Sequence, residues 1–510
     1  MMSLRQSNPS AGEEQNVQQA AAKGASWLLA ARFAAKSIDA VVLFILARVL
    51  EAADFGLVAL AMGFILVAEA MLELPVGLAI LRLKMIDPAH FDTAFTLSIL
   101  RSIVFLIISY VLAYPISLLS SDSRIINLIL ILSIAPIVRG LASPYMIVFV
   151  KNLDFSREFA AEICGKIFGA FMSLYVAYTF RSYWAIAAGT VTTPLVGTIL
   201  SYIMAPYRPR LTLEKWRAFS HFIGWGAITQ LFVAISWQCD RFFLGHFVTK
   251  ADLGQYALSS DLANFPNQSV IVPIMRPLNT VIYGRTDDLD GLRRAYLQAV
   301  STICTLGIPA YVGLFITSDQ VARLFLGPEW GRVGYILGVI ALSFLPGLFT
   351  LPWPSVTVAL ERPKLITIAT SIEFFVKLPV TWFTVKNYGV EGAIWARVCM
   401  NVFIALIAFV FLKRLINLSY RQQLEAAIRP IIASAVMTIM ILPLLFYMLT
   451  LDTGIKFALC LASVIALGGA SYTLVLMMLW YFSGSPPGAE HLVERLYKKL
   501  RFKVFRTVEA

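Results

Sequence analysis

Charged residues are scarce in this chain, and their scarcity excludes a soluble globular protein. Asp, Glu, Lys and Arg make up 14% of the 510 residues, against about 25% in soluble domains. Hydrophobic residues make up 59%, and the mean hydropathy is +0.76. Apolar segments of about 20 residues, long enough to cross a bilayer as helices, recur along the chain. We therefore expect an all-α integral membrane protein with many spans.

Cysteine and histidine are also few, and their placement argues against disulfides and metal sites. Each cysteine lies within or at the end of an apolar segment, which favours ordinary buried thiols. The histidines lack the spacing of zinc ligands. We expect no metal and no cofactor. The residues concerned are Cys164, Cys239, Cys304, Cys399 and Cys460, with His90, His221, His246 and His491.

Motifs of catalysis and nucleotide binding are missing as well. Gly165-Lys166 lacks the upstream glycine of a phosphate-binding loop, so ATP is not the expected energy source. No long outer loop is available to house a glycosyltransferase, ligase or polymerase site. We therefore predict no catalytic residues and a protein that is not an enzyme.

The apolar segments predict fourteen transmembrane helices with both termini in the cytoplasm. In this arrangement the inner loops and C-terminal tail carry 25 Lys and Arg, whereas the outer loops carry nine. One missed or invented helix would invert every later loop and erase this positive-inside asymmetry. The segments lie near residues 26–48, 56–80, 92–118, 125–148, 158–180, 183–205, 218–245, 253–282, 295–317, 332–358, 364–385, 389–412, 427–449 and 457–482.

An octapeptide occurs twice and indicates two related halves. Ala-Asp-Phe-Gly-Leu-Val-Ala-Leu at 53–60 returns as Ala-Asp-Leu-Gly-Gln-Tyr-Ala-Leu at 251–258. Six predicted helices separate the copies, so both have the same orientation, as in a parallel repeat about the membrane normal. Asp54 and Asp252 are most simply helix caps; a gating role is the alternative.

Ionisable residues inside the spans are the best functional leads, because each Arg, Lys or Asp at mid-helix costs about 2.5–3.5 kcal/mol. In the first predicted helix, Arg32, Lys36 and Asp39 share one face. This face lines an aqueous cavity, or Lys36 and Asp39 neutralise each other. Glu69 and Glu73 lie four residues apart near the end of the second helix.

Later spans carry further charges. Glu162 with Lys166, and Glu373 with Lys377, have the spacing of neutral pairs within one helix. The segment at 253–282 is the most polar, and its three prolines predict a broken helix that faces a cavity or a mobile seam. Its charged residues are Asp261 and Arg276, and other spans contain Arg101, Arg139 and Arg397, the last without a partner in its own helix.

Several short stretches, in a consistent order over about residues 24–480, give the chain a family resemblance. Together they resemble the Wzx-like lipid-linked oligosaccharide flippases, polysaccharide transporters of the multidrug/oligosaccharidyl-lipid/polysaccharide superfamily. Glu51, in place of Gly, departs from the pattern and bears only on loop geometry. The stretches are Leu46-Ala47-Arg48-Val49-Leu50, Glu73-Leu74, Tyr207-Arg208-Pro209-Arg210-Leu211, Asp240-Arg241, Leu253-Gly254-Gln255-Tyr256, Leu292-Arg293-Arg294-Ala295-Tyr296, Leu326-Gly327-Pro328-Glu329-Trp330 and Ala359-Leu360-Glu361-Arg362-Pro363.

The resemblance implies two pseudo-symmetric six-helix lobes around a central cavity, with helices 13 and 14 peripheral. We divide the chain into a disordered cytoplasmic tail (1–23), an N-lobe (24–210), a C-lobe (211–415), helices 13 and 14 (416–483) and a basic tail (484–510). Leu492, Val493, Leu496 and Leu500 predict a basic helix on the inner leaflet, or the tail is simply solvated. The net charge of +12 follows from topology, so no nucleic-acid partner is expected.

The implied function is alternating-access export of an undecaprenyl-pyrophosphate oligosaccharide across a bacterial inner membrane. The product would be exopolysaccharide, capsule or O-antigen, and a polysaccharide polymerase and co-polymerase are possible partners. A diphosphate entering the membrane needs fixed cations, and buried carboxylates suit a coupling proton or sodium ion. The candidate cations are Arg32, Lys36, Arg101, Arg139, Arg276 and Arg397; the candidate carboxylates are Asp39, Glu69, Glu73 and Asp261.

Four other functions compete with this one. A drug or cation antiporter of the same superfamily should favour carboxylates and aromatic walls over unpaired intramembrane arginines. A lipid II flippase shares the topology and the need for cations. A membrane-embedded polymerase or ligase is disfavoured by the short outer loops. A scaffold of a polysaccharide export complex needs no cavity residues at all.

Overall fold

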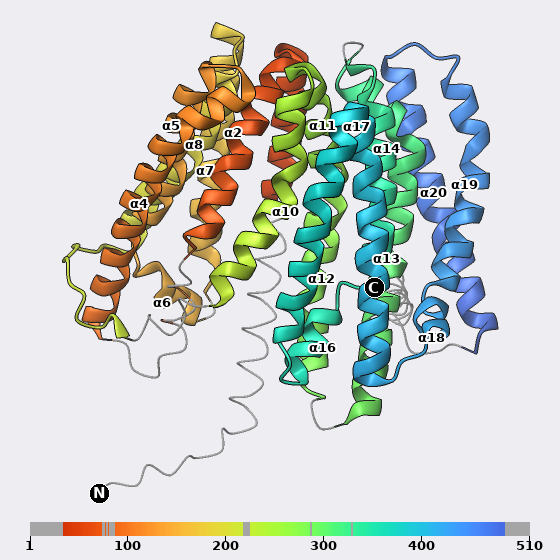
Figure 1. The fold of residues 1–510 in the computed structure, drawn as a ribbon. Coiled ribbons are helices and arrows are strands. Elements are labelled where there is room, and N and C mark those ends of the chain that lie inside the picture. Colours follow the sequence, from red (N-terminus) through yellow and green to blue (C-terminus); the bar gives the residue numbers. More distant parts are fainter. Residues whose placement is uncertain are drawn as a thin grey trace, which may run out of the picture. The chain divides into compact units, whose positions relative to one another are not determined.

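In the computed structural model, helices are the only regular secondary structure of the described residues (Figure 1). It describes residues 34–73, 77, 80, 87–152, 154–217, 225–285, 288–327 and 330–484, and no strand occurs among them. The all-α prediction is confirmed. The predicted tail at 1–23, and all of the predicted tail at 484–510 except Gly484, lie outside the described residues, and with them the basic helix.

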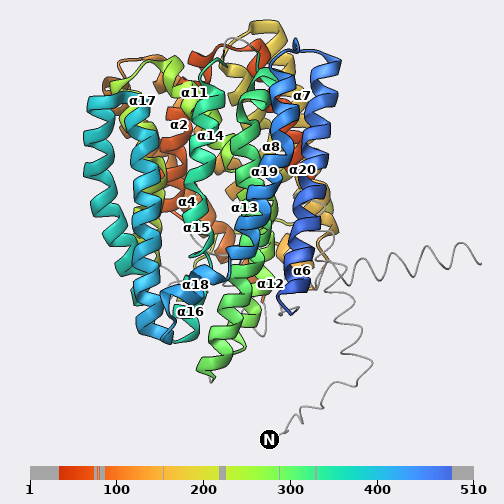
Figure 2. The ribbon, with the colours of Figure 1, turned by 90° about the vertical axis from the view of Figure 1, so that its right-hand side faces the viewer.

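Nine helices within the described ranges are long and apolar enough to cross a bilayer. The longest, α17 (Lys364–Ile416), has 53 residues, more than twice the length that a bilayer requires. Gly389 inside it is non-helical, with φ 57° and ψ −130°, so α17 consists of two helices that run side by side (Figure 2). A multi-span membrane protein is therefore confirmed, and the count of fourteen spans stays a prediction.

The chain divides into two compact units, residues 1–234 and 235–510. In the first, residues 34–49 are helical, and α5 packs against α2, α4 and α8 through the fully buried Ile125, Leu128, Ile129 and Leu132. The other helices of this unit are α2 (Ala52–Met71), α4 (Pro88–Ser120), α5 (Arg124–Gly140), α6 (Met146–Lys151), α7 (Ser156–Phe180) and α8 (Trp184–Met204).

Close packing between α7 and α8 depends on small side chains. Gly165, Gly169, Ser173 and Ala177 form a buried stripe on α7 at intervals of four residues. A Cβ atom added at Gly169 would lie 2.1 Å from Thr193 Oγ1 on α8. This small-residue seam is the usual way for helices to approach closely in a membrane, where apolar burial supplies little driving force.

The second unit is built around α13 (Leu289–Phe325). Tyr296 and Tyr311 of this helix are fully buried, and Tyr296 donates a hydrogen bond of 2.7 Å to the carbonyl of Phe349. Tyr472 of α20 donates one of 2.6 Å to the carbonyl of Thr305, so the C-terminal helices pack on α13. The helices around α13 are α14 (Val333–Ser343), α15 (Leu345–Leu348), α16 (Trp353–Ala359), α17, α18 (Tyr420–Glu425), α19 (Ile428–Met448) and α20 (Ile455–Phe482).

The polar segment near 253–282 is broken, as its prolines predict. After α10 (Trp225–Phe247), α11 (Lys250–Ala263) ends before Pro266, a π-helix follows at Asn267–Ile271, and α12 spans Val272–Tyr283. Proline removes an intrahelical hydrogen bond, and π-helical turns often accompany functional sites. The break therefore supports a role for this segment beyond packing.

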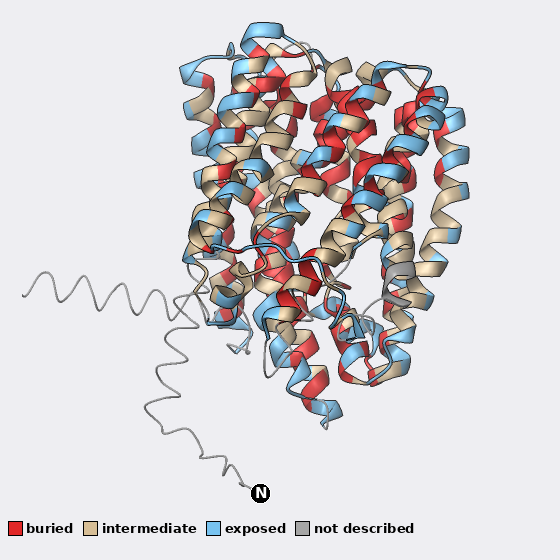
Figure 3. Cartoon of the chain, turned by 90° about the vertical axis from the view of Figure 1, so that its left-hand side faces the viewer, coloured by how far each residue is buried: buried red, intermediate tan, exposed pale blue. Residues whose placement is uncertain are grey.

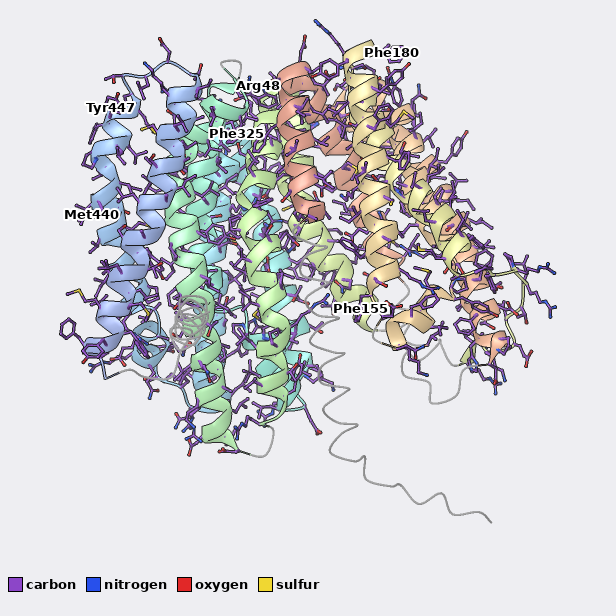
Figure 4. The ribbon with its side chains drawn as sticks, turned by 180° about the vertical axis from the view of Figure 1, so that it is seen from behind. Arg48, Phe155, Phe180, Phe325, Met440 and Tyr447 are labelled. Atoms are coloured by element: carbon purple, nitrogen blue, oxygen red, sulfur yellow. The ribbon has the colours of Figure 1, made fainter. Side chains whose placement is uncertain are left out.

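Many large apolar side chains are exposed, as expected for a protein surrounded by lipid. Met440 and Tyr447 of α19, labelled in Figure 4, are 56% and 57% exposed. Exposed, intermediate and buried residues alternate along the helices instead of forming bands across them (Figure 3). Each helix thus turns one face to its neighbours and another away from them.

Both copies of the repeated octapeptide begin helices, and the aspartate lies in the first turn of each helix. Asp54 and Asp252 lie in the first turns of α2 and α11, and the cap positions belong to Glu51 and Thr249. The Thr249 hydroxyl accepts a hydrogen bond of 3.1 Å from the Asp252 amide and donates one of 2.8 Å to its carboxylate. The aspartates are therefore not the N-cap residues, but Asp54 still caps a free backbone amide, because its carboxylate accepts a hydrogen bond from the Glu51 N–H.

Candidate functional site

Glu69 of α2 gathers two arginines from neighbouring helices in the first unit. Its Oε1 lies 2.7 Å from Nη1 of Arg139 on α5 and 3.7 Å from Nη2 of Arg101 on α4. The Glu69 and Arg101 side chains are 22% and 21% exposed. One carboxylate therefore faces two guanidinium groups, which leaves one positive charge in excess.

Asp39 forms a second cluster in which one carboxylate again lies near two cations. Its Oδ1 lies 2.5 Å from Nζ of Lys166 on α7, and its Oδ2 lies 3.9 Å from Nζ of Lys36, one turn away. The predicted Lys36–Asp39 contact is present, but Lys166 is the nearer partner. Again one carboxylate serves two cations. We call the Glu69 and Asp39 groups together the cation clusters.

A cavity of about 710 Å³ connects these clusters in the first unit. Arg101, Arg139 and Lys166 line it, together with Glu158 and Glu162. Hydroxyl groups lie in the same wall; that of Thr198 donates a hydrogen bond of 2.9 Å to the carbonyl of Val138. A smaller cavity of about 200 Å³ contains Asp39 and also reaches Lys166.

The mixture of groups in the larger cavity determines which ligands suit it. Guanidinium groups bind phosphate oxygens through two parallel hydrogen bonds, and such charge-assisted bonds are roughly twice as strong as neutral ones. Carboxylates and hydroxyls accept hydrogen bonds from sugar hydroxyls. The wall can therefore bind a molecule that carries both phosphate and sugar.

Two predicted pairs within single helices are wrong. Lys166 binds Asp39 instead of Glu162, which is exposed and lines the cavity. Lys377 donates a hydrogen bond of 2.5 Å to the carbonyl of Ser236 on α10, and Glu373 interacts with it only at longer range. In both cases a group on a neighbouring helix lies closer than the residue one turn away.

The second unit buries a polar network that the sequence analysis missed. Asp240 of α10 is 4% exposed and accepts a hydrogen bond of 2.8 Å from the Tyr256 hydroxyl. Arg397 lies 3.4 Å from the Ser260 hydroxyl, 5.2 Å from the Phe344 ring centroid, and in contact with Tyr256. Arg397, predicted to bind substrate, is thus held by side chains from other helices.

The remaining candidates are scattered. Asp261 forms an ion pair of 2.6 Å with Arg241, whereas Arg276 on α12 and Glu73 after α2 are exposed. Arg32 lies outside the described residues. No group of three metal-ligating side chains occurs where the chain is described. The structure thus gathers Lys36, Asp39, Glu69, Arg101 and Arg139 into two clusters and leaves the other described candidates apart.

Asp240 and Lys166 carried signals that were available in the sequence. Asp240 is a carboxylate near the end of an apolar segment, and it was noted only as part of the Asp240-Arg241 motif. Lys166 was assigned to a neighbour on its own helix by the rule of four-residue spacing. That rule describes exposed helices, and it fails where a membrane protein has another helix within reach.

Known proteins of similar sequence and fold are transporters. The lipopolysaccharide biosynthesis protein WzxC of Escherichia coli (strain K12) is 20% identical over 408 residues, covering 78% of this chain and 82% of WzxC. A solved structure of the lipid II flippase MurJ, in an inward closed conformation, has a TM-score of 0.66 at 15% identity, covering 90% of this chain and 98% of MurJ. An inward-facing multidrug resistance MATE transporter gives 0.59 at 14%, covering 75% and 94%.

These relatives are flippases and transporters, not enzymes, and the two solved structures show that this chain has their fold. The sequence family described as polysaccharide biosynthesis protein matches residues 45–334, more than half of the chain. The predicted resemblance to Wzx-like flippases is confirmed: this chain belongs to the polysaccharide biosynthesis protein family.

Proposed function

We propose that this protein moves a lipid-linked oligosaccharide from the inner to the outer leaflet of a bacterial inner membrane. The substrate is an undecaprenyl-pyrophosphate oligosaccharide destined for exopolysaccharide, capsule or O-antigen. Membership of a polysaccharide biosynthesis family supports the pathway, and the many apolar helices support the location. The observation that carries the proposal is the cavity of about 710 Å³ lined by Arg101, Arg139 and Lys166.

Arg101 and Arg139 hold the pyrophosphate in this proposal. Glu69 keeps both guanidinium groups in place before the substrate arrives, so little side-chain entropy is lost on binding. The spare positive charge of the Glu69 group then attracts the diphosphate. Glu158 and Glu162 on the same cavity wall accept hydrogen bonds from the sugar.

The carboxylates of the cation clusters also suit ion coupling. A coupling proton or sodium ion at Glu69 or Asp39 would compete with the two cations that share the carboxylate, so the coupling ion and the substrate phosphate act on the same side chains. Proton binding and substrate binding are therefore linked through the same carboxylate. Ion coupling of this kind would drive alternating access in this proposal.

The substitutions Arg101→Gln and Arg139→Gln test the site. In a strain that lacks the chromosomal gene, each should lower surface polysaccharide about tenfold, since a hydrogen bond to a charged group contributes about 1.5–3 kcal/mol. Lipid-linked oligosaccharide should accumulate on the cytoplasmic face. Extraction and mass analysis of the lipid intermediate, alongside a surface polysaccharide assay, measure both effects.

Arg124→Gln is the matched control, because Arg124 lies at the opposite end of α5 from Arg139 and pairs with Asp122 at 2.7 Å. It should leave export unchanged. If both site variants produce the wild-type amount of surface polysaccharide at a normal protein level, Arg101 and Arg139 do not form the pyrophosphate site. If deletion of the gene leaves the polysaccharide intact and dye efflux falls, the protein is instead a drug exporter.

A lipid II flippase is the second candidate, because the MurJ fold covers 90% of this chain. Lipid II also carries a pyrophosphate, so the same cations would serve it. Expression in a bacterium depleted of its own lipid II flippase separates the two. Restored growth would favour lipid II; restored surface polysaccharide in an export mutant, without restored growth, would favour the oligosaccharide.

A further inference from the structure

A second polar cavity, of about 520 Å³, lies in the second unit at the helix ends predicted to be cytoplasmic. It is formed by the end of α12, the first turns of α13, the short helix α18 and the start of α19. Figure 2 shows α18 beside the lower part of α13. This cavity contains none of the residues discussed for transport.

Three arginines give the cavity a positive charge. Arg285, Arg294 and Arg429 line it, together with one carboxylate, that of Glu425. Arg421 binds the Glu425 carboxylate with an Nε–Oε1 distance of 2.6 Å, which offsets that negative charge. Arg294 is partly engaged by Asp288 at 3.6 Å. The cavity therefore has a net positive charge and suits an anion.

A buried hydroxyl in the wall independently indicates a ligand. Ser301 is 7% exposed and lines the cavity. Its Oγ has no hydrogen-bond partner among the residues that the structure describes. Buried hydroxyl groups are normally paired, so a ligand oxygen in the cavity would complete the bonding of this one.

Apolar side chains at the same helix ends indicate where that ligand comes from. Val281 of the cavity wall is 51% exposed, as is Leu289 at the start of α13. Leu424 on α18 and Ile428 on α19 are 50% and 46% exposed. A free phosphate makes no favourable contact with apolar side chains, whereas the acyl chains of a lipid would pack against them.

We propose that this cavity binds the phosphodiester headgroup of an anionic phospholipid from the inner leaflet. The arginines and the Ser301 hydroxyl contact the phosphate oxygens, and the exposed apolar side chains contact the glycerol and upper acyl chains. Basic pockets between transmembrane helices at the cytoplasmic surface are suited to such headgroups. The bound lipid joins α12, α13 and α19 at this surface.

Native mass spectrometry of the full-length protein in detergent tests the proposal, with phosphatidylglycerol as the ligand and phosphatidylcholine and inorganic phosphate as comparisons. Wild type should retain phosphatidylglycerol in preference to both. Arg285→Gln and Arg429→Gln should each weaken phosphatidylglycerol binding about fivefold, because each arginine near an anionic lipid contributes about 1 kcal/mol. Arg414→Gln, an exposed arginine at the end of α17 that does not line the cavity, should leave it unchanged.

The Ser301→Ala variant separates a loss of lipid binding from a loss of folding. Because the hydroxyl has no hydrogen-bond partner in the described part of the chain, its removal should not lower the melting temperature, yet it should weaken phosphatidylglycerol binding. Equal binding by wild type and the three cavity variants would overturn the proposal. So would phosphate binding as tight as that of phosphatidylglycerol, which would identify a soluble anion as the ligand. Neither result depends on which substrate the protein transports.

Discussion

Two carboxylates of the first unit each lie near two cations. Asp39 and Glu69 each face two basic side chains, of which at least one lies on a helix far away in the sequence. Removing one such carboxylate leaves its two cations without their nearest counter-charge. We therefore expect these two residues to affect both stability and transport.

The substitution Asp39→Asn should lower the free energy of unfolding by about 1–2 kcal/mol. Lys166 loses its nearest negative partner, and the partial exposure of both side chains keeps the effect below that of a fully buried pair. Thermal stability of the detergent-solubilised protein, followed by size-exclusion chromatography, measures the loss. The double variant Asp39→Asn/Lys166→Met should recover most of it, because the uncompensated lysine charge is gone.

Asp452→Asn is the control, since Asp452 lies exposed between α19 and α20. It should melt at the wild-type temperature. If Asp39→Asn also melts there, the Lys166 contact does not stabilise the fold.

At this scale the sequence identified the charged faces but not the partners. Arg101, Arg139 and Glu69 stood out because each is costly inside an apolar segment. Which of them meet depends on helix packing, and residues from α2, α4 and α5 are brought together only by the fold. Local spacing misassigned Lys166 and Lys377 for the same reason.

Among the helices, α7 and α8 show how strongly small residues control packing. Gly169→Ala would place a Cβ within 2.1 Å of Thr193 Oγ1 and 3.0 Å of the Gly189 carbonyl. The helices must then separate, and overpacking of this kind costs about 1–3 kcal/mol. We expect a lower melting temperature and a distorted cavity, since Thr193 and Lys166 both line it.

Gly469→Ala on α20 is the matched control, because nothing lies within 4 Å of its added Cβ. It should be neutral or slightly stabilising, since alanine is the better helix former by about 1 kcal/mol. A Gly169→Ala variant as stable as Gly469→Ala would show that the α7–α8 seam can relax.

The apolar segments of the sequence predicted where the helices lie. The sequence predicted only some of the breaks inside those helices. The prolines near 266–277 predicted a break, and a π-helix is present there. Gly389 gives no such warning in the sequence, although its positive φ divides α17. A glycine inside an apolar run is ordinary until the backbone conformation is known, so this turn was placed by counting spans.

At the scale of the whole chain, the two copies of the repeated octapeptide make similar contacts with neighbouring helix ends. In the first unit, Arg124 at the start of α5 lies 5.8 Å from the Tyr183 ring centroid and interacts with Asp54. In the second, Arg332 just before α14 lies 3.5 Å from Asp252 and 3.0 Å from Glu391. In each half, the start of the repeated helix therefore contacts an arginine and a third helix end, which is the similarity that the predicted repeat leads us to expect.

These helix ends are predicted to lie outside the cell, and labelling of single cysteines tests that prediction for each unit. In a variant without native cysteines, Ser182→Cys and Asp452→Cys should react with a membrane-impermeant maleimide added to intact cells. Arg210→Cys and Arg362→Cys should react only after permeabilisation. All four positions lie between helices in the described chain.

The pattern also tests the predicted count of fourteen spans. In the first unit, Arg48 and Phe180 lie at one end of the helices and Phe155 at the other (Figure 4), as alternating loops require. If one helix between 210 and 362 were missing or invented, Arg362→Cys would label from outside and Asp452→Cys would not. The positive-inside asymmetry would then have no explanation, and the anionic-lipid cavity beside α18 would face the wrong leaflet. Labelling as predicted places that cavity at the inner leaflet.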